Sequence, residues 1–364
     1  MTDDTAVPGP AGRVRAARLT DLAALGELSR LSHGEGPEDG SVHSLGLPVT
    51  GSQISVFSLF RMPLGAFQAQ DRLYVYEEDH RIAGLLRAES DGHRDEWTIV
   101  ELDAVGQGEA GDISYRLVHH LLRDGAKRGV ARFHVACADQ GGNVELFMQH
   151  GFARYGEEWL YARPPDLALP EPFGPEQMAE TGIRPTAPLD ALGLSRLYAA
   201  ATPQPVVRLE AYRLPDWERQ GAQWRVPRSS LAPILRFADV SAFIQVRAGA
   251  DVQQADAEFG AFLQVGVAKE DQPHYLRIVA RSDHDTAQLI RFGLGHIGDA
   301  AAGHRVGVRG HRHDHGVVAP VRTYESPIDR RLEEADFERI ATVTLLMKET
   351  LVRVAIPALV PAVR

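Results

Sequence analysis

Apolar residues recur along the chain with two periods, two residues in some segments and three to four in others. Segments 73–79, 81–89 and 97–105 alternate apolar and polar residues, which predicts half-buried strands. Segment 113–128 repeats its apolar residues every three or four positions and is followed by Gly129, which predicts an amphipathic helix with a glycine stop. The centre of the first half therefore predicts three strands followed by a long helix.

The flanking segments extend this order to helix, apolar lobe, three strands, helix, strand, helix, strand. They comprise a helix at 19–32, an apolar lobe at 52–70, a strand at 130–138, a short helix at 143–150 and a strand at 154–163. The second part of the chain predicts the same order again. Its elements are a helix at 188–200, strands at 241–249, 260–268 and 274–280, a helix at 284–297, a strand at 305–310, a helix at 326–335 and a strand at 341–354.

Two short sequence matches support an internal repeat. Residues 14–25 (VRAARLTDLAAL) resemble residues 183–194 (IRPTAPLDALGL), and the Gly-Phe pair at 151–152 matches the Asp-Phe pair at 336–337. The two offsets, 169 and 185 residues, agree to within one small insertion. A tandem duplication explains both matches.

At 364 residues the chain is long enough for two domains. Residues 164–182 are rich in proline and predict a linker. The predicted organisation is a tail at 1–12, a domain at 13–163, the linker, a domain at 183–356 and a tail at 357–364. We expect an α/β fold in which each domain has its own mixed sheet of six or seven strands flanked by helices.

Composition narrows the class of protein. The net charge of −10 disfavours non-specific binding to nucleic acid or to anionic lipid. The single cysteine, Cys137, excludes an internal disulfide. No apolar run reaches the length of a membrane span and the N-terminus lacks a signal-like segment, so we expect a cytoplasmic protein.

Three short runs resemble the GNAT (N-acetyltransferase) superfamily. They are Leu102-Asp-Ala104, Ile113-Ser-x-x-Leu117-Val118 and Gly151-Phe152, similar to the family's L-x-V-x-P-x-x-R-G-x-G-I-G-x-x-L-L run and its Y-x-x-x-G-F helix end. The resemblance covers nearly all of 13–163 and, more faintly, 183–354. It implies acetyl-CoA held in a splay between two central strands, with its pyrophosphate on the amides of a loop and a helix start.

The phosphate loop fits the family pattern in two registers. One places Glu109 at the Arg/Gln position and Asp112 at a glycine position, where Asp112 is also a suitable N-cap that would compete with phosphate. The other starts the loop at Gln107 and uses Gly108 and Gly111. The resemblance implies these cofactor-binding candidates: Ala104, Val105, Gln107, Gly108, Ala110, Gly111, Asp112, Ile113, Ser114, Asn143 and Phe147.

The catalytic groups depart from the family pattern. Phe147 stands where the family has its acidic tyrosine, so Tyr155 or Tyr161 would have to donate the proton, and both also suit ordinary strand positions. Glu101 is the best-placed base, followed by Asp103. Enzyme activity is therefore left open, with acetyl transfer to an amine weighed against a degenerate binding or scaffold protein.

The second copy has fewer residues that match a cofactor site. Its strand at 274–280 leads into Arg281–Thr286 without a glycine, and Gly293 and Gly295 fall inside the next helix. The alternating histidines at 311–315 suit a solvated loop better than a metal site, so no metal is expected. Expected partners are a small-molecule or peptide amine, with the chain acting as an internal pseudo-dimer or as a homodimer.

Overall fold

The computed structural model describes residues 12–21, 23–25, 28, 44–46, 71–90, 95–105, 110–219, 226–246, 258–268, 272–304 and 316–350. In the first half the strands are β1 (Arg13–Ala16), β2 (Asp71–Glu78), β3 (Arg81–Ser90), β4 (Glu96–Ala104), β5 (Arg132–Cys137) and β6 (Ala153–Arg163). The helical elements of this half are η1 (Leu19–Asp21), η2 (Ser44–Gly46), α3 (Ala110–Lys127) and α4 (Asn143–Gln149), and residues 23–25 and 28 are also helical.

The second half follows the same order. Its strands are β7 (Ile183–Pro185), β8 (Phe237–Val246), β9 (Phe259–Ala268), β10 (His274–Ala280), β11 (Val317–Arg322) and β12 (Glu338–Glu349). Its helical elements are α5 (Pro175–Thr181), η4 (Pro188–Asp190), α6 (Ala191–Ala201), α7 (Gln204–Glu210), α8 (Leu214–Trp217), α9 (Ala287–His304), η6 (Thr323–Glu325) and α10 (Ser326–Glu333).

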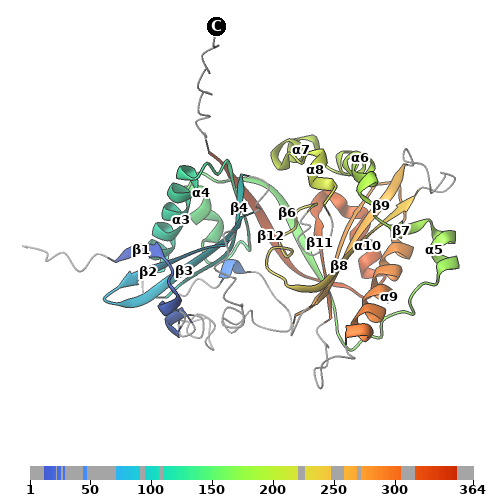
Figure 1. Cartoon of the computed structure of the whole chain (residues 1–364), viewed down its shortest axis with the longest axis horizontal. Coiled ribbons are helices and arrows are strands. Elements are labelled where there is room, and N and C mark those ends of the chain that lie inside the picture. Colours follow the sequence, from blue (N-terminus) through green and yellow to red (C-terminus); the bar gives the residue numbers. More distant parts are fainter. Residues whose placement is uncertain are drawn as a thin grey trace, which may run out of the picture.

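All the described strands form one twelve-stranded sheet, in the order β1-β2-β3-β4-β5-β12-β6-β11-β10-β9-β8-β7 (Figure 1). The expectation of two separate sheets is therefore wrong. Each half contributes six strands, but its last strand crosses over: β12 pairs with β5, and β6 pairs with β11. The two exchanged strands pair antiparallel with each other at the centre. Periodicity does not encode this exchange, because strand neighbours are set by tertiary contacts.

The internal repeat is visible in side-chain geometry. Arg15 binds both carboxylate oxygens of Asp21 at 2.6 and 2.9 Å, and Arg184 binds both oxygens of Asp190 at 2.8 and 2.7 Å. In each copy one of these carboxylate oxygens also accepts a backbone N–H, from Arg18 or from Ala187, at 2.7 Å. The same arrangement links the first strand of each half to the 3-10 helix after it, in the two segments that match in sequence.

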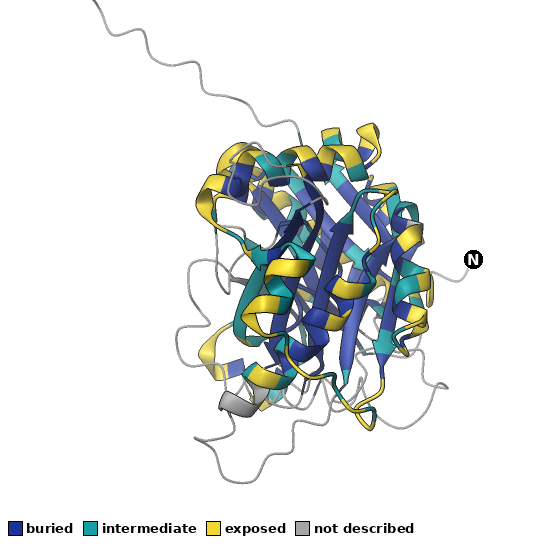
Figure 2. Ribbon diagram, turned by 90° about the vertical axis from the view of Figure 1, so that its right-hand side faces the viewer, coloured by how far each residue is buried: buried dark blue, intermediate teal, exposed yellow. Residues whose placement is uncertain are grey.

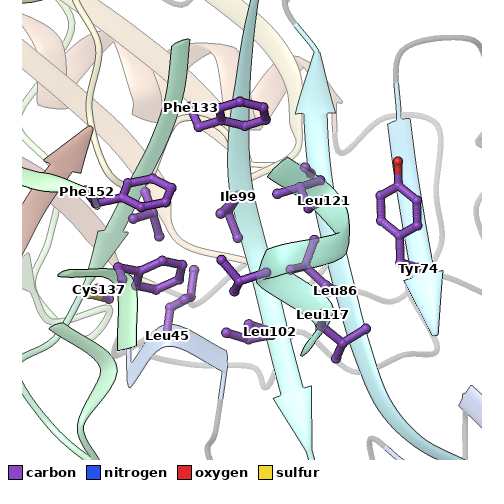
Figure 3. Packing of buried hydrophobic residues seen from close by; sticks show 14 of the residues in the cluster. Leu45, Tyr74, Leu86, Ile99, Leu102, Leu117, Leu121, Phe133, Cys137 and Phe152 are labelled. Atoms are coloured by element: carbon purple, nitrogen blue, oxygen red, sulfur yellow. The ribbon is translucent and has the colours of Figure 1, made fainter. Parts of the chain in front are cut away.

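Helices cover both faces of the sheet, and the buried residues concentrate on the strands (Figure 2). In the first half, α3 and α4 pack on one face around a core that includes Ile99, Leu117 and Phe133 (Figure 3). The exchanged strands join the opposite cores: Leu346 of β12 lies in this first core, and Tyr161 of β6 lies in the core of the second half.

Several predicted elements differ from the structure. The segment predicted as a linker contains helix α5, which starts at Pro175. The predicted strand at 305–310 lies outside the described residues, and β11 holds the corresponding position in the sheet. The lobe at 52–70 also lies outside them. The short strands β1 and β7 were not predicted, because strands of 4 and 3 residues carry no readable period.

Candidate functional site

The two central parallel strands of the first half separate along their length. β4 pairs with β5 only from Glu96↔Arg132 to Ile99↔Val135, although β4 continues to Ala104. At the same point β4 carries a β-bulge against β3, which leaves Val100 outside the register. A bulge bends the strand and frees backbone groups from the ladder. The structure thus contains the splay that the sequence led us to expect.

The helix α3 begins at the mouth of this splay. Its first turn holds Gly111, which is exposed, and a Cβ added there would meet no atom within 4 Å. Asp112 is not the N-cap predicted from sequence: the helix starts two residues earlier, and its carboxylate lies 2.7 Å from Nε of Arg116, one turn on. Gln107 and Gly108 lie outside the described residues.

The other candidate residues of the loop lie in the core of the first half or are held against the sheet. Ala104, Ala110 and Ile113 are buried in the core of the first half, and Val105 donates its N–H to the carbonyl of Ala83 at 2.9 Å. Phe147 is also core, packed edge-to-face on Phe152 at 5.3 Å between ring centroids. These residues hold α3 and α4 against the sheet.

Two buried polar atoms stand out on the helices beside the splay. Ser114 Oγ on α3 and Asn143 Oδ1 on α4 are among the buried side-chain atoms of the described residues that have no hydrogen-bond partner, as is Thr286 Oγ1 beside the start of α9 in the second half. Buried polar atoms are nearly always paired in folded proteins, so each needs an explanation, and a bound ligand is one. Ser114 and Asn143 were both cofactor candidates.

The chain itself fills part of the splay. Leu45 is 1% exposed and packs in the same core as Ile99 and Leu102, and its carbonyl accepts a 2.8 Å hydrogen bond from the N–H of Ala138. Figure 3 shows it between β5 and β4. Its φ of 54° is unfavourable for a branched side chain. No pattern in the sequence predicts this placement.

Glu101, the predicted base, forms an ion pair within the sheet. Glu101 is buried on β4, and its Oε2 accepts a 3.1 Å hydrogen bond from Nε of Arg87 on β3. Asp103 beyond it is fully buried. The Glu101 carboxylate thus links β4 to β3 through Arg87.

The predicted acid, Tyr155, lies at the junction of the two halves. Its hydroxyl is 3.5 Å from Oε1 of Glu210 on α7, and the Arg322 guanidinium stacks over its ring at 5.8 Å. Burial raises the pKa of Tyr155 to about 12, so it keeps its proton at neutral pH. The alternative, Tyr161, is 2% exposed within the core of the second half.

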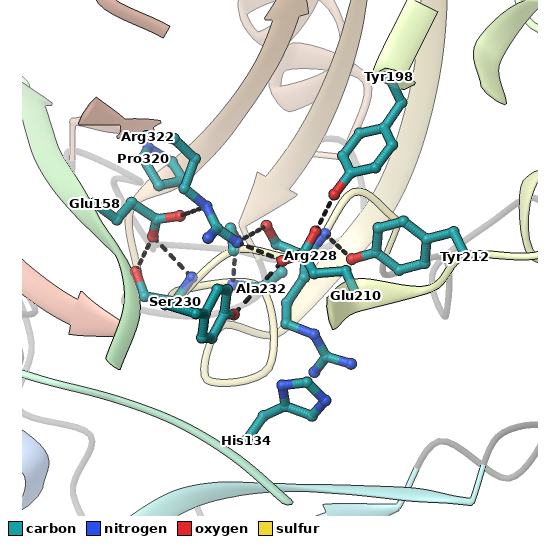
Figure 4. Close-up of polar contacts among 12 residues, drawn as sticks. His134, Glu158, Tyr198, Glu210, Tyr212, Arg228, Ser230, Ala232, Pro320 and Arg322 are labelled. Carbon is teal, nitrogen blue, oxygen red and sulfur yellow. Dashed lines mark hydrogen bonds and ion pairs between the residues drawn. The ribbon is translucent and has the colours of Figure 1, made fainter. Parts of the chain in front are cut away.

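Figure 4 shows a buried polar network that includes Glu158, Glu210 and Arg322, and Tyr155 lies against it. Arg322 bridges Glu158 of the first half at 3.1 Å and Glu210 of the second half at 3.0 Å. Burial alone would raise the pKa of Glu210, but the charge of Arg322, the hydrogen bond from Tyr198 and the charge of Arg228 together lower it below its ordinary value. The sequence did not predict this network, since its residues are far apart in the chain and meet only through the exchanged strands.

His134 on β5 belongs to the same region. Its Nε2 lies 3.4 Å from Oε2 of Glu96, and the same Glu96 oxygen accepts a 2.7 Å hydrogen bond from Arg228. Burial, and then the Arg228 charge, lower the pKa of His134 to about 4. The imidazole is therefore neutral near pH 7.

In the second half, the equivalent strands β10 and β11 also separate, but side chains of this half fill the space between them. β10 pairs with β11 only at His274↔Val317 and Tyr275↔Val318, and its pairing with β9 has no bulge. Beyond the last pair, Arg277 donates to both oxygens of Glu325 at 2.7 and 2.8 Å and to the carbonyl of Pro320 at 3.4 Å. This ion pair occupies the position of the opening between β4 and β5.

The helix start beside this second splay is also occupied. Oδ1 of Asp285 accepts the N–H of Ala287, the first residue of α9, at 3.0 Å. The same oxygen lies 3.0 Å from Nε of Arg331. A side-chain carboxylate already takes the amide that an anionic ligand would use.

Other classes of site find no support in the described part of the chain. No three His, Cys, Asp or Glu side chains there are placed to bind a metal, and His311, His313 and His315 lie outside it. None of the helices it includes is long and apolar enough to cross a membrane.

Comparison with solved structures identifies the fold. No protein-family model matches this sequence, and no curated protein matches it significantly. A tandem GNAT protein from the clavulanic acid biosynthesis pathway is similar at 15% identity and a TM-score of 0.50, over 93% of this chain and 98% of its own. A GCN5-related N-acetyltransferase from Sphaerobacter thermophilus is similar at 15% identity and a TM-score of 0.51, over 93% of this chain and 95% of its own. The predicted fold class, GNAT-like in tandem, is confirmed.

Proposed function

From the premise that this chain carries the GNAT fold twice in tandem, we propose that its first half binds acetyl-CoA and transfers the acetyl group to an amine. The difference between the two halves carries this proposal. The first half combines a bulged splay, an open helix start and the unpartnered Ser114 Oγ and Asn143 Oδ1. In the second half, Arg277 and Asp285 fill the equivalent places.

The residues of the first half fit the parts of the cofactor. The first-turn amides of α3 offer the dipole and donors that a pyrophosphate needs, and Gly111 leaves them unobstructed. Ser114 and Asn143 would hydrogen-bond the polar groups of the pantetheine arm. Bound acetyl-CoA supplies an activated acyl thioester, whose carbon the amine attacks.

Proton transfer falls to residues on the other side of the splay. Tyr155 is neutral and can donate its hydroxyl proton to the departing thiolate, and the proton that the amine nitrogen loses as the amide forms then restores this hydroxyl, which makes Tyr155 the acid of this proposal. Glu101 is held by Arg87, so we assign it the role of fixing β4 against β3 and not that of a base. The acceptor is a small-molecule or peptide amine.

The second half then acts as a scaffold. Its strand β12 completes the sheet beside β5, and its α7 supplies Glu210 next to Tyr155. Because the exchange is complete within one chain, we also propose that the protein works as a monomer with internal pseudo-symmetry.

One observation favours the second candidate function, a binding or scaffold protein without catalysis. Leu45 occupies the opening that the pantetheine arm would enter. Acetyl-CoA binding therefore requires residues 44–46 to leave the splay, whereas a non-catalytic protein would keep them in place permanently.

Replacing Leu45 with Gly separates the two functions. Glycine accepts the positive φ of this position and removes the side chain from the splay. If the first half is a cofactor site, wild type binds acetyl-CoA by calorimetry and Leu45→Gly binds it about tenfold more tightly, since no side chain must be displaced. Absence of binding in both proteins, at unchanged thermal stability, would favour the non-catalytic function.

A further inference from the structure

A segment of the second half lies over the central strands of the first. Residues 226–236 connect the α8 region to β8, yet Arg228 donates to Glu96 at 2.7 Å and to Thr98 Oγ1 at 2.9 Å, both on β4. Further along, Arg236 donates to Glu89 on β3 at 2.8 Å. Residues 226–236 therefore form a roof over the strands of the first half, close to the point where β4 and β5 separate.

This roof is anchored on several sides. The N–H of Ser230 donates to Oε1 of Glu158 at 2.8 Å, and Ser229 Oγ lies 2.7 Å from the hydroxyl of Tyr275 on β10. The N–H of Arg236 donates to Gln272 at 2.7 Å. Because these contacts join both halves, the roof holds its position independently of Leu45.

A small cavity lies beneath the roof at the apex of the splay. Its volume of about 20 Å³ is room for one water-sized group. The first half contributes Ile99, Val100 and Val135, and the second half contributes Pro233, Ile234 and Leu345. A ligand arm that enters beside α3 and follows β4 inward ends at this apex, since β4 leads directly into α3.

We propose that Pro233 and Ile234 of the second half form the end wall of the acyl pocket of the first half and restrict it to an acetyl group. The inference rests on the proposed function, because it concerns the end of the same site. Leu45 also lines this cavity and would leave it with residues 44–46, whereas Pro233 and Ile234 stay in place. An acyl chain longer than acetyl would then have to displace Ile234, which is only 7% exposed. Acyl-chain selectivity would thus be set by the copy that does not bind the cofactor.

The test compares acetyl-CoA and butyryl-CoA by calorimetry on the full chain. Wild type should bind butyryl-CoA at least about tenfold more weakly than acetyl-CoA. Ile234→Ala should reduce this ratio to within about threefold by opening the wall, and Ile234→Val should give an intermediate ratio with less effect on folding. Leu235→Ala is the matched control, since Leu235 is also buried, at 2% exposed, but does not line the cavity.

The possible outcomes distinguish a failure of the assigned wall from a failure of the proposed cofactor site. Equal affinity of wild type for both acyl-CoAs, or an equal effect of Leu235→Ala, would overturn the assigned wall and leave the cofactor site standing. Absence of binding to acetyl-CoA and butyryl-CoA alike would overturn the proposed function and the inference with it.

Discussion

The pKa of His134 is set by groups from both halves of the molecule. It is 2% exposed and faces Glu96 and Arg228, and its pKa is lowered from 6.5 to about 4. Between these values the unfolded chain binds more protons than the folded one. The contribution of His134 to stability is therefore lost as the pH falls from about 6.5 towards 4.

Replacing His134 with Gln should remove this part of the pH dependence. Between pH 7 and pH 5 the free energy of unfolding of wild type should fall by about 2 kcal/mol more than that of the variant. Urea unfolding at both pH values measures the difference. His119→Gln, on the exposed side of α3, serves as the control. Parallel pH profiles for wild type and His134→Gln would contradict the assignment.

At the residue scale the sequence located residues but not their partners. Arg15 and Asp21 belong to the repeated segment, yet the ion pair between them and its copy in the second half are visible only in the structure. Glu101 was placed correctly on a strand, but the Arg87 opposite it was not foreseen. Leu45 carries no local signal at all, since what places it in the splay is the gap between two later strands.

At the element scale, α3 and α9 are equivalent helices with unlike beginnings. The first turn of α3 presents Gly111 to open space, whereas Asp285 takes the first amide of α9. A valine at the second helical position should therefore affect ligand binding in one copy only. A Cβ at position 111 lies more than 4 Å from the described atoms around it and valine is a better helix former than glycine, so the fold should be unaffected or slightly stabilised.

Gly111→Val should weaken acetyl-CoA binding at least about tenfold, because its side chain would project into the path of the phosphates. Gln288→Val, at the second position of α9, should bind as wild type does. Calorimetry on the three proteins, with thermal melting to verify folding, measures both effects. A similar affinity in all three would place the phosphates away from α3.

Most elements were predictable because their periods are long enough to read. Helix α3 spans 18 residues and β4 spans 9, and both were located to within a few residues. The start of α3 was misplaced, since Asp112 is a good cap by residue type and the helix begins before it. Helix α5 was hidden among prolines, although Pro175 at its first turn is a favourable helix start.

At the scale of the whole molecule, the exchanged strands make the two halves one cooperative unit. β12 lies between β5 and β6, and Leu346 on it packs in the core of the first half. The sequence indicated two copies but not this exchange, because β6 and β12 have the same pattern whichever neighbour they pair with. Tertiary contacts alone select the partner.

Unfolding should accordingly occur in a single transition in scanning calorimetry. Loss of either half would expose the edges of β6 and β12, so neither half can unfold alone without cost to the other. Leu346→Ala, in the second copy's strand, should lower the stability of the whole protein by about 2–5 kcal/mol and keep one transition. Two separable transitions, with only one displaced by the substitution, would contradict this account.

The strand exchange also bears on how the duplicated copies can change over time. Two independent genes can each be lost, but here the second copy cannot be deleted without removing the strand that completes the first. The donated strand β12 thus makes the second copy indispensable to the fold of the first, whatever side chains fill the opening of the second copy, where Arg277 pairs with Glu325.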